Sequence, residues 1–188
     1  MRATDPEREE GFTLIEVLVT SMLLVLVLAI AGTLIGSLST TSRTVNSLTA
    51  TTSSAQIAAE SVERGIRNSS DFLLSVPSGT DQMLVARTAQ SGTTLNWVCS
   101  AWYYSAANGG SIRFKTSTTA IAAPNAAALA QWTLLAQGVA PSSGTTIFSG
   151  SSPTLSFSFK STSAGAGAAT IKSTVLSRAG SSGTPACY

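Results

Sequence analysis

A long stretch without charge dominates the first quarter of this chain. No charged residue occurs between Glu16 and Arg43, so residues 17–42 form 26 consecutive uncharged positions. The centre of this span, from Met22 to Ile30, is almost purely aliphatic. The hydrocarbon core of a bilayer is about 30 Å thick, and roughly 20 apolar residues in a helix cross it. The span therefore predicts one helix that crosses a membrane.

Two other interpretations of the apolar span are less favoured. A helix buried in a soluble core seldom continues beyond about 10–14 residues without a charge. A secretory signal peptide has an apolar region of about 7–15 residues that ends at a small-residue cleavage site. Here the run is longer, and the small residues after it, near Ala31-Gly32 and Gly36-Ser37, continue into further helical sequence. Membrane insertion is therefore the preferred interpretation.

Glu16 stands at the start of the apolar run, where an acid is unexpected. An ionised carboxylate at membrane depth is costly unless a partner compensates its charge. One interpretation places Glu16 at the interface, with its side chain reaching toward water. The other is that the carboxylate accepts a cation supplied by another chain.

The residues around Glu16 resemble a known processing site. Gly11-Phe12-Thr13-Leu14-Ile15-Glu16-Val17-Leu18-Val19 is similar to the prepilin motif of type IV pilins and pseudopilins. The resemblance implies that a prepilin peptidase cuts between Gly11 and Phe12 and that the new N-terminal amine of Phe12 is methylated. It also implies that Glu16, then the fifth residue of the mature chain, pairs with the N-terminal amine of a neighbouring subunit.

The orientation across the membrane follows from the resemblance. Residues 1–11 contain two arginines and four acids, whereas basic leaders are commoner in the family. The orientation of a membrane helix depends on the numbers of Lys and Arg residues on its two sides. Because Arg43 follows the span, the difference between the two sides is small here. The resemblance implies a single-pass inner-membrane protein with its leader in the cytoplasm and its head outside. After assembly the protein would lie in an extracellular filament.

Gly32 and Gly36 form a G-x-x-x-G spacing within the apolar span. Small residues at this spacing allow two helices to approach closely in lipid. Alternatively, the glycines loosen the helix near the membrane exit, since each costs about 1 kcal/mol relative to alanine. Both interpretations, helix packing and helix loosening, remain open from the sequence.

The helical pattern continues beyond Ser42 but becomes amphipathic. Apolar residues recur at three- and four-residue steps, with Thr52 between them: Val45, Leu48, Ala55, Ala59, Val62 and Ile66. Asn68-Ser69-Ser70 predicts the end of the helix. One helix from about Phe12 to Arg67 is the simplest interpretation.

After Ser70 the pattern changes to short apolar runs separated by turns. We expect strands at 72–76, 83–87, 95–104, 111–116, 132–139, 145–148, 155–160 and 170–176, with a hairpin at Asn108-Gly109. A long helix followed by an antiparallel sheet predicts an α+β fold. The expected divisions are a leader at 1–11, a membrane and filament-core helix at 12–42, its amphipathic continuation at 43–70 and a β-rich head at 71–188.

The chain has two cysteines, Cys99 and Cys187. Outside the cytoplasm a disulfide between them is favoured. On the loop-entropy model, closing the loop between them would contribute roughly 4 kcal/mol to the free energy of unfolding. Its local effect would be to hold a Gly- and Ser-rich tail on the sheet. Two free thiols are the alternative.

The composition offers little for catalysis. Histidine is absent, which excludes His-based acid–base chemistry and imidazole metal sites. Ser158 and Lys160 share one strand face, but solvent-facing polar residues are the simpler interpretation of that alternation. Trp97, Trp102, Tyr103 and Tyr104 with Arg113 and Lys115 could form a surface on which nucleic acid bases stack, although cross-strand packing is the default. We expect no metal, no cofactor, no small-molecule substrate and no enzymatic activity.

The sequence thus predicts a structural subunit of a type IV pilus or a related filament. Its expected partners are prepilin peptidase, other pilin subunits, the assembly machinery and membrane lipid. The head, with Trp102-Tyr103-Tyr104 and a return strand that carries Arg113, resembles minor pilins of the W or J type. The alternatives are a pseudopilin of a secretion system, a tip adhesin or DNA-binding pilin, and an anchored enzyme.

Overall fold

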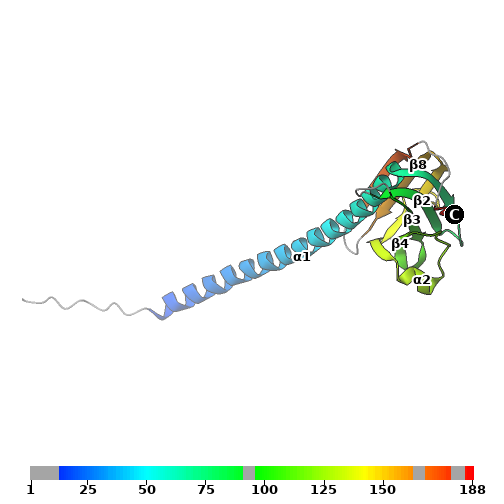
Figure 1. Ribbon diagram of the computed structural model, residues 1–188. Coiled ribbons are helices and arrows are strands. Elements are labelled where there is room, and N and C mark those ends of the chain that lie inside the picture. The colour runs from blue at the N-terminus through cyan, green and yellow to red at the C-terminus, as the bar shows by residue number, and fades with distance from the viewer. Residues whose placement is uncertain (1–12, 91–95, 163–167, 179–184) are drawn as a thin grey trace, which may run out of the picture. The chain divides into compact units, whose positions relative to one another are not determined.

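The computed structural model describes residues 13–90, 96–162, 168–178 and 185–188 (Figure 1). The chain divides into two units, one up to Arg43 and one from Thr44 to Tyr188. Among the described residues, the first unit is helical, and the second contains the end of the same helix, nine strands and two short helical segments. The expected α+β fold, a long apolar N-terminal helix followed by antiparallel sheet, is confirmed.

The first helix, α1, spans Leu14–Arg67 and has 54 residues. Its end at Arg67 agrees with the sequence prediction, whereas the expected start at Phe12 lies outside the described residues. Arg64 and Arg67 occupy the last turn, where a positive charge interacts favourably with the helix dipole. The N–H of Asn68 donates to the carbonyl of Arg64 at 3.1 Å and so satisfies one of the last carbonyls.

Five strands form the first sheet, in the order β1-β2-β3-β4-β5. Each strand is antiparallel to its neighbour, so the chain runs back and forth through the sheet. The strands are β1 (Ser69–Ser75), β2 (Gln82–Gln90), β3 (Asn96–Ser105), β4 (Ser111–Ser117) and β5 (Thr133–Gln137). The expected turn at Asn108-Gly109 is present as η1 (Ala107–Gly109), in which Asn108 and Gly109 have φ of 53° and 81°.

A second antiparallel sheet is built around β8. Strand β9 pairs with β8 along one edge, while β6 and β7 pair with the two halves of the other edge. The strands are β6 (Val139–Pro141), β7 (Phe148–Ser151), β8 (Thr154–Ser161) and β9 (Ala169–Leu176). The short helix α2 (Ala126–Ala130) precedes β5, and Asn125 caps it by accepting a hydrogen bond from the N–H of Ala128.

The division into two sheets differs from the single sheet expected. The segment 132–139 was predicted to be one strand, but its residues belong to β5 of the first sheet and β6 of the second. Between them Gly138 has φ of 70°, and a Cβ there would come within about 2.5 Å of the carbonyl oxygen of Thr162. Only glycine suits this position, so the chain can turn there from one sheet to the other.

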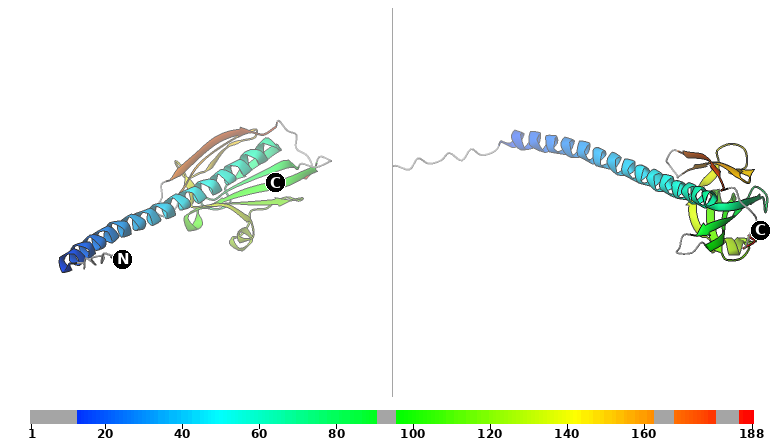
Figure 2. Two further views of the ribbon diagram at one scale, coloured as in Figure 1. Left: turned by 90° about the vertical axis from the view of Figure 1, so that its left-hand side faces the viewer. Right: turned by 45° about the horizontal axis from the view of Figure 1, so that its top comes forward.

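The last turns of α1, from about Ala55, lie between the two sheets (Figure 2). Its buried positions are small or β-branched, namely Ala55, Ala58, Ala59, Val62 and Ile66, which lets the strands approach closely. The core around it takes Leu84, Trp102 and Ile112 from the first sheet and Phe157 and Phe159 from the second. Val45, expected on the buried face, is instead 55% exposed, so the packed part of the helix begins near Ala55.

The opposite face of the first sheet is covered as well. Met83, Val85, Ala101 and Tyr103 pack there against Ile121, Trp132 and Cys187 from the connection before β5 and from residues 185–188. Strands β2 and β3 are therefore buried on both faces. This double burial explains their continuous apolar sequences, because an alternating pattern suits a strand with one face in water.

Gln82 connects the two sheets through a buried side chain that is 2% exposed. Its Oε1 accepts hydrogen bonds from the N–H groups of Ile147 and Phe148 at 2.7 and 2.9 Å. Its Nε2 donates to the carbonyl of Phe148 at 2.9 Å. The start of β2 is thereby fixed to the start of β7.

Replacing Gln82 with leucine is expected to lower the free energy of unfolding by about 2–4 kcal/mol, because it leaves buried backbone groups of Ile147 and Phe148 unpaired. Urea unfolding of the detergent-solubilised full chain, followed by tryptophan fluorescence, measures this loss. The control Gln131→Leu changes an exposed glutamine and should have little effect. Equal stability of the two variants would contradict the bridging role.

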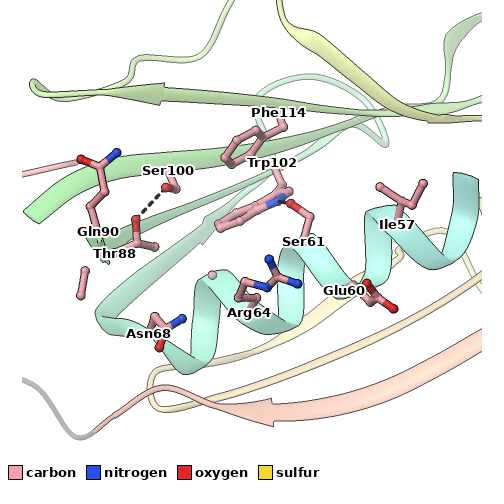
Figure 3. A pocket seen from close by; sticks show the side chains of 12 residues that line it. Ile57, Glu60, Ser61, Arg64, Asn68, Thr88, Gln90, Ser100, Trp102 and Phe114 are labelled. Atoms are coloured by element: carbon pink, nitrogen blue, oxygen red, sulfur yellow. Dashed lines mark hydrogen bonds between the residues drawn. The ribbon is translucent and has the colours of Figure 1, made fainter. Parts of the chain in front are cut away.

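Gly65 allows the Trp102 ring to lie directly against α1. A Cβ at position 65 would overlap the Cη2 and Cζ2 atoms of Trp102. The ring is 1% exposed, and its Nε1 donates to Ser61 Oγ at 2.9 Å, so it is held in place and cannot move aside (Figure 3).

Gly65→Ala is therefore expected to destabilise the protein by about 1–3 kcal/mol through overpacking. Alanine is intrinsically favoured over glycine in a helix by about 1 kcal/mol, so helix propensity alone predicts the opposite sign. The matched control is Gly36→Ala, since no heavy atom lies within 4 Å of a Cβ there. Thermal unfolding of both variants separates the two predictions.

Candidate functional site

Glu16 lies in the first turn of α1, where a negative charge interacts favourably with the helix dipole. The turn is closed by hydrogen bonds from the N–H groups of Glu16 and Val17 to the carbonyl of Thr13, at 3.0 and 3.3 Å. Gly11 and Phe12, the expected cleavage and methylation residues, lie outside the described residues.

The Glu16 side chain is exposed. Across the residues that the structure describes, no hydrogen bond or ion pair reaches its carboxylate. A partner for this charge therefore lies outside the described residues: in water, in lipid headgroups, in another chain or in the rest of this chain. The geometry leaves the role predicted for Glu16 in subunit pairing open.

The surface of α1 that follows Glu16 is apolar and uncovered. The large apolar side chains from Leu14 to Leu38 are 52–81% exposed. Within the described residues, α1 is the one helix long and apolar enough to cross a membrane. So large an apolar surface is unfavourable in water and must be covered by lipid or by other helices.

The hydroxyl groups within this apolar segment are satisfied inside the helix. Thr20 Oγ1 donates to the carbonyl of Glu16 at 2.8 Å, and Ser21 Oγ donates to that of Leu18 at 2.9 Å. Thr33 and Ser37 donate in the same way to the carbonyls of Ile30 and Leu34. Such internal bonds remove much of the cost of placing Ser and Thr in hydrocarbon.

Gly32 and Gly36 lie in helical backbone. A Cβ at either position would meet no heavy atom within 4 Å. Both glycines therefore border open space in the single chain. Their proposed part in helix packing or helix loosening remains a prediction.

The expected disulfide joins Cys99 of β3 to Cys187. It holds residues 185–188 on the face of the first sheet opposite α1, where the N–H of Ile121 donates to the carbonyl of Cys187 at 3.3 Å. The Tyr188 hydroxyl donates to the carboxylate of Asp71 on β1. The tail is thus attached by one covalent bond and by polar contacts of Cys187 and Tyr188.

Two hydrogen-bonded pairs of a tyrosine and a carboxylate stabilise the first sheet. Burial alone would raise the pKa of Asp71, but hydrogen bonds from Tyr188, Ser152 and the Phe72 amide, with the charge of Arg87, together lower it. Burial and then the bond to Asp71 raise the pKa of Tyr188. A lowered carboxyl pKa stabilises the fold above the ordinary value of 3.8, and this contribution is lost as the pH falls through the folded-state pKa.

The second pair is Tyr103 with Asp81. Burial, followed by the hydrogen bond to Asp81 and its charge, raises the pKa of Tyr103 to about 12. Asp81 also accepts the N–H of Ala106 at 2.8 Å, so its carboxylate fixes the start of the turn between β3 and β4.

The aromatic residues of β3 do not form a common surface. Trp102, Tyr103 and Tyr104 are each 1–4% exposed, and Tyr103 points to the sheet face opposite the other two. Trp97 instead lies under the Arg87 guanidinium at 4.5 Å. Buried rings cannot stack on nucleic acid bases, so the stacking surface considered from the sequence is not built by Trp102, Tyr103 and Tyr104.

Ser158 and Lys160 share the outer face of β8, as the alternation predicts, with Lys160 exposed. Ser158 Oγ forms a hydrogen bond with Ser142 Oγ at 2.5 Å. Across the described ranges, no group of three or more His, Cys, Asp or Glu residues is placed to hold a metal ion.

Comparison with known proteins adds one finding. The family model described as the prokaryotic N-terminal methylation motif matches residues 8–32. The match includes the expected cleavage position, Glu16 and most of the aliphatic run, and it stops before the amphipathic part of α1. No curated protein and no solved structure matches the chain.

Proposed function

We propose that this chain, whose motif indicates a type IV pilin-like protein processed by prepilin peptidase, is a minor structural subunit of a type IV pilus or related filament. The motif points to a structural protein, and the helix fits one that is anchored in a membrane and later enters a filament. The proposal goes further in assigning a minor, W- or J-like subunit that primes assembly or lies at the tip.

The observation that carries this proposal is the uncovered apolar surface of α1 from Leu14 to Leu38, most of which lies within the matched motif. Lipid covers this surface while the subunit is stored in the membrane, and neighbouring helices cover it in the filament. The subunit can therefore move from one environment to the other without exposing the helix to water.

Cleavage after Gly11 supplies the positive charge with which Glu16 of another subunit pairs. It creates an ammonium group at Phe12, four residues before Glu16 in the sequence. A buried charge that has a partner of opposite sign is far less costly than an isolated one. The pair between Glu16 of one subunit and Phe12 of the next forms at one vertical offset, so it selects the register of the helices.

Sheared filaments test the proposal. Deletion of this chain should reduce the number of filaments per cell, and the chain should be recovered in the sheared fraction at a small fraction of the major subunit. Quantitative mass spectrometry of that fraction gives the ratio. Absence of the chain from filaments whose number is unchanged by its deletion would refute the assignment.

A further inference from the structure

A cleft of about 400 Å³ lies between the last turns of α1 and the first sheet (Figure 3). Glu60, Arg64 and Asn68 line it from the helix, and Gln90, Trp102 and Phe114 line it from strands β2, β3 and β4. Its volume falls within the range of small-molecule sites, roughly 300–1,000 Å³.

Within the described part of the chain, most of the polar side chains around the cleft have no partner. Across the residues that the structure describes, no hydrogen bond or ion pair reaches the side chains of Glu60, Arg64, Asn68 or Gln90. The Ser61 hydroxyl accepts the bond from Trp102 Nε1, which leaves its own hydrogen free to be donated. The cleft thus offers carboxylate, guanidinium, amide and hydroxyl groups to a ligand.

The charges and the apolar surface restrict the ligand. Glu60 and Arg64 carry opposite charges. An anionic ligand would be attracted by Arg64 and repelled by Glu60, and a cationic ligand would be attracted by Glu60 and repelled by Arg64. Phe114 is partly exposed, and its ring packs against Trp102 with centroids 5.3 Å apart. The site suits a neutral molecule with one apolar face and several groups that both donate and accept hydrogen bonds.

Strand pairing disfavours a peptide in this position. Extended peptides gain affinity by adding to a free strand edge. Here β2 pairs with β1 and β3, β3 pairs with β2 and β4, and β4 pairs with β3 and β5. A peptide therefore cannot bind in this cleft by adding a strand to β2, β3 or β4.

We propose that this cleft binds a neutral saccharide. Each sugar hydroxyl can donate to Glu60 and accept from Arg64, Asn68 or Gln90, while the C–H face of the ring lies on Phe114. This binding is separate from assembly through the N-terminal helix, and only the measurement in filaments below rests on the function proposed above.

The test uses the full chain in detergent and a panel of N-acetylglucosamine, galactose, glucose and their β-1,4-linked dimers. Because Trp102 lines the cleft, its fluorescence reports occupancy. At least one sugar of the panel should give a saturable change. The double variant Asn68→Ala/Gln90→Ala should then bind it at least about tenfold more weakly, since each lost hydrogen bond weakens binding by roughly three- to tenfold.

The control variant Gln56→Ala removes an exposed amide of α1 outside the cleft and should bind like the wild type. Unchanged thermal unfolding of the double variant separates lost contacts from lost folding. No saturable response to any sugar of the panel, or equal affinity of the double variant and the control, would overturn the proposal.

A neighbouring subunit, rather than a saccharide, is the other occupant of the cleft that an experiment must be able to detect. Both native cysteines are in the disulfide, so Gln90→Cys introduces one free thiol at the cleft. The thiol should react with a maleimide equally fast in detergent and in sheared filaments. Protection in filaments alone would show that another chain covers the cleft, and would contradict the saccharide proposal.

Discussion

The variant Glu16→Ala is expected to enter the membrane and lose its leader like the wild type, yet to be nearly absent from filaments. Insertion depends on the apolar surface from Leu14 to Leu38, which the substitution leaves unchanged. The proposed cleavage site, Gly11, lies outside the described residues and five positions earlier in the sequence. Removal of the carboxylate should affect only the proposed pairing with the N-terminal ammonium of a neighbouring subunit.

The expected amount in sheared filaments is less than about one tenth of the wild-type level, because removing one partner of a buried ion pair costs several kcal/mol. Glu16→Gln should behave in the same way, since it keeps the size but not the charge. The control Glu60→Ala removes an exposed acid from the second half of the same helix. Recovery of Glu16→Ala in filaments at the control level would contradict the register role.

Loss of the disulfide between Cys99 and Cys187 should destabilise the head by about 4 kcal/mol, as the loop-entropy model gives for a separation of 88 residues. The local consequence is release of residues 185–188, which uncovers Met83, Val85 and Ala101. The double variant Cys99→Ser/Cys187→Ser should therefore unfold at lower urea concentration than the wild type.

The same loss should follow reduction of the wild-type protein. The two unfolding curves are expected to coincide, because both remove the same covalent link. The control is the double variant treated with reductant, which should show no further change. Equal stability of oxidised and reduced protein would contradict the part assigned to the disulfide.

The sequence predicted the long helix and its end well. The 26-residue uncharged span and the sequence Asn68-Ser69-Ser70 are local signals that tertiary packing does not override. The pairing of Cys99 with Cys187 also followed from the sequence, since the chain has two cysteines and the compartment expected for the head favours oxidation.

The two-sheet arrangement could not be predicted in the same way. The strand expected at 132–139 is interrupted by the backbone conformation of Gly138, and only the close approach of Thr162 shows why a turn is needed there. Likewise, Gln82 directly precedes the strand expected at 83–87, and nothing in the sequence near it indicates a buried side chain. Its three hydrogen bonds join segments about 65 residues apart, which no local pattern reveals.

The candidate site shows the same limit. The spacing from Gly11 to Glu16 identifies the motif, but the partner of Glu16 belongs to no described part of this chain. The cleft beside Trp102 gave no sequence signal, because its residues come from one helix and three strands and each type is common on surfaces.

The most direct test of the account is the N-terminal sequence and intact mass of the protein extracted from membranes, with and without its prepilin peptidase. The account predicts a chain that begins at N-methylated Phe12 when the peptidase is present, and one that retains residues 1–11 when it is absent. Protein recovered from working filaments with Gly11 and the residues before it still attached would contradict the account.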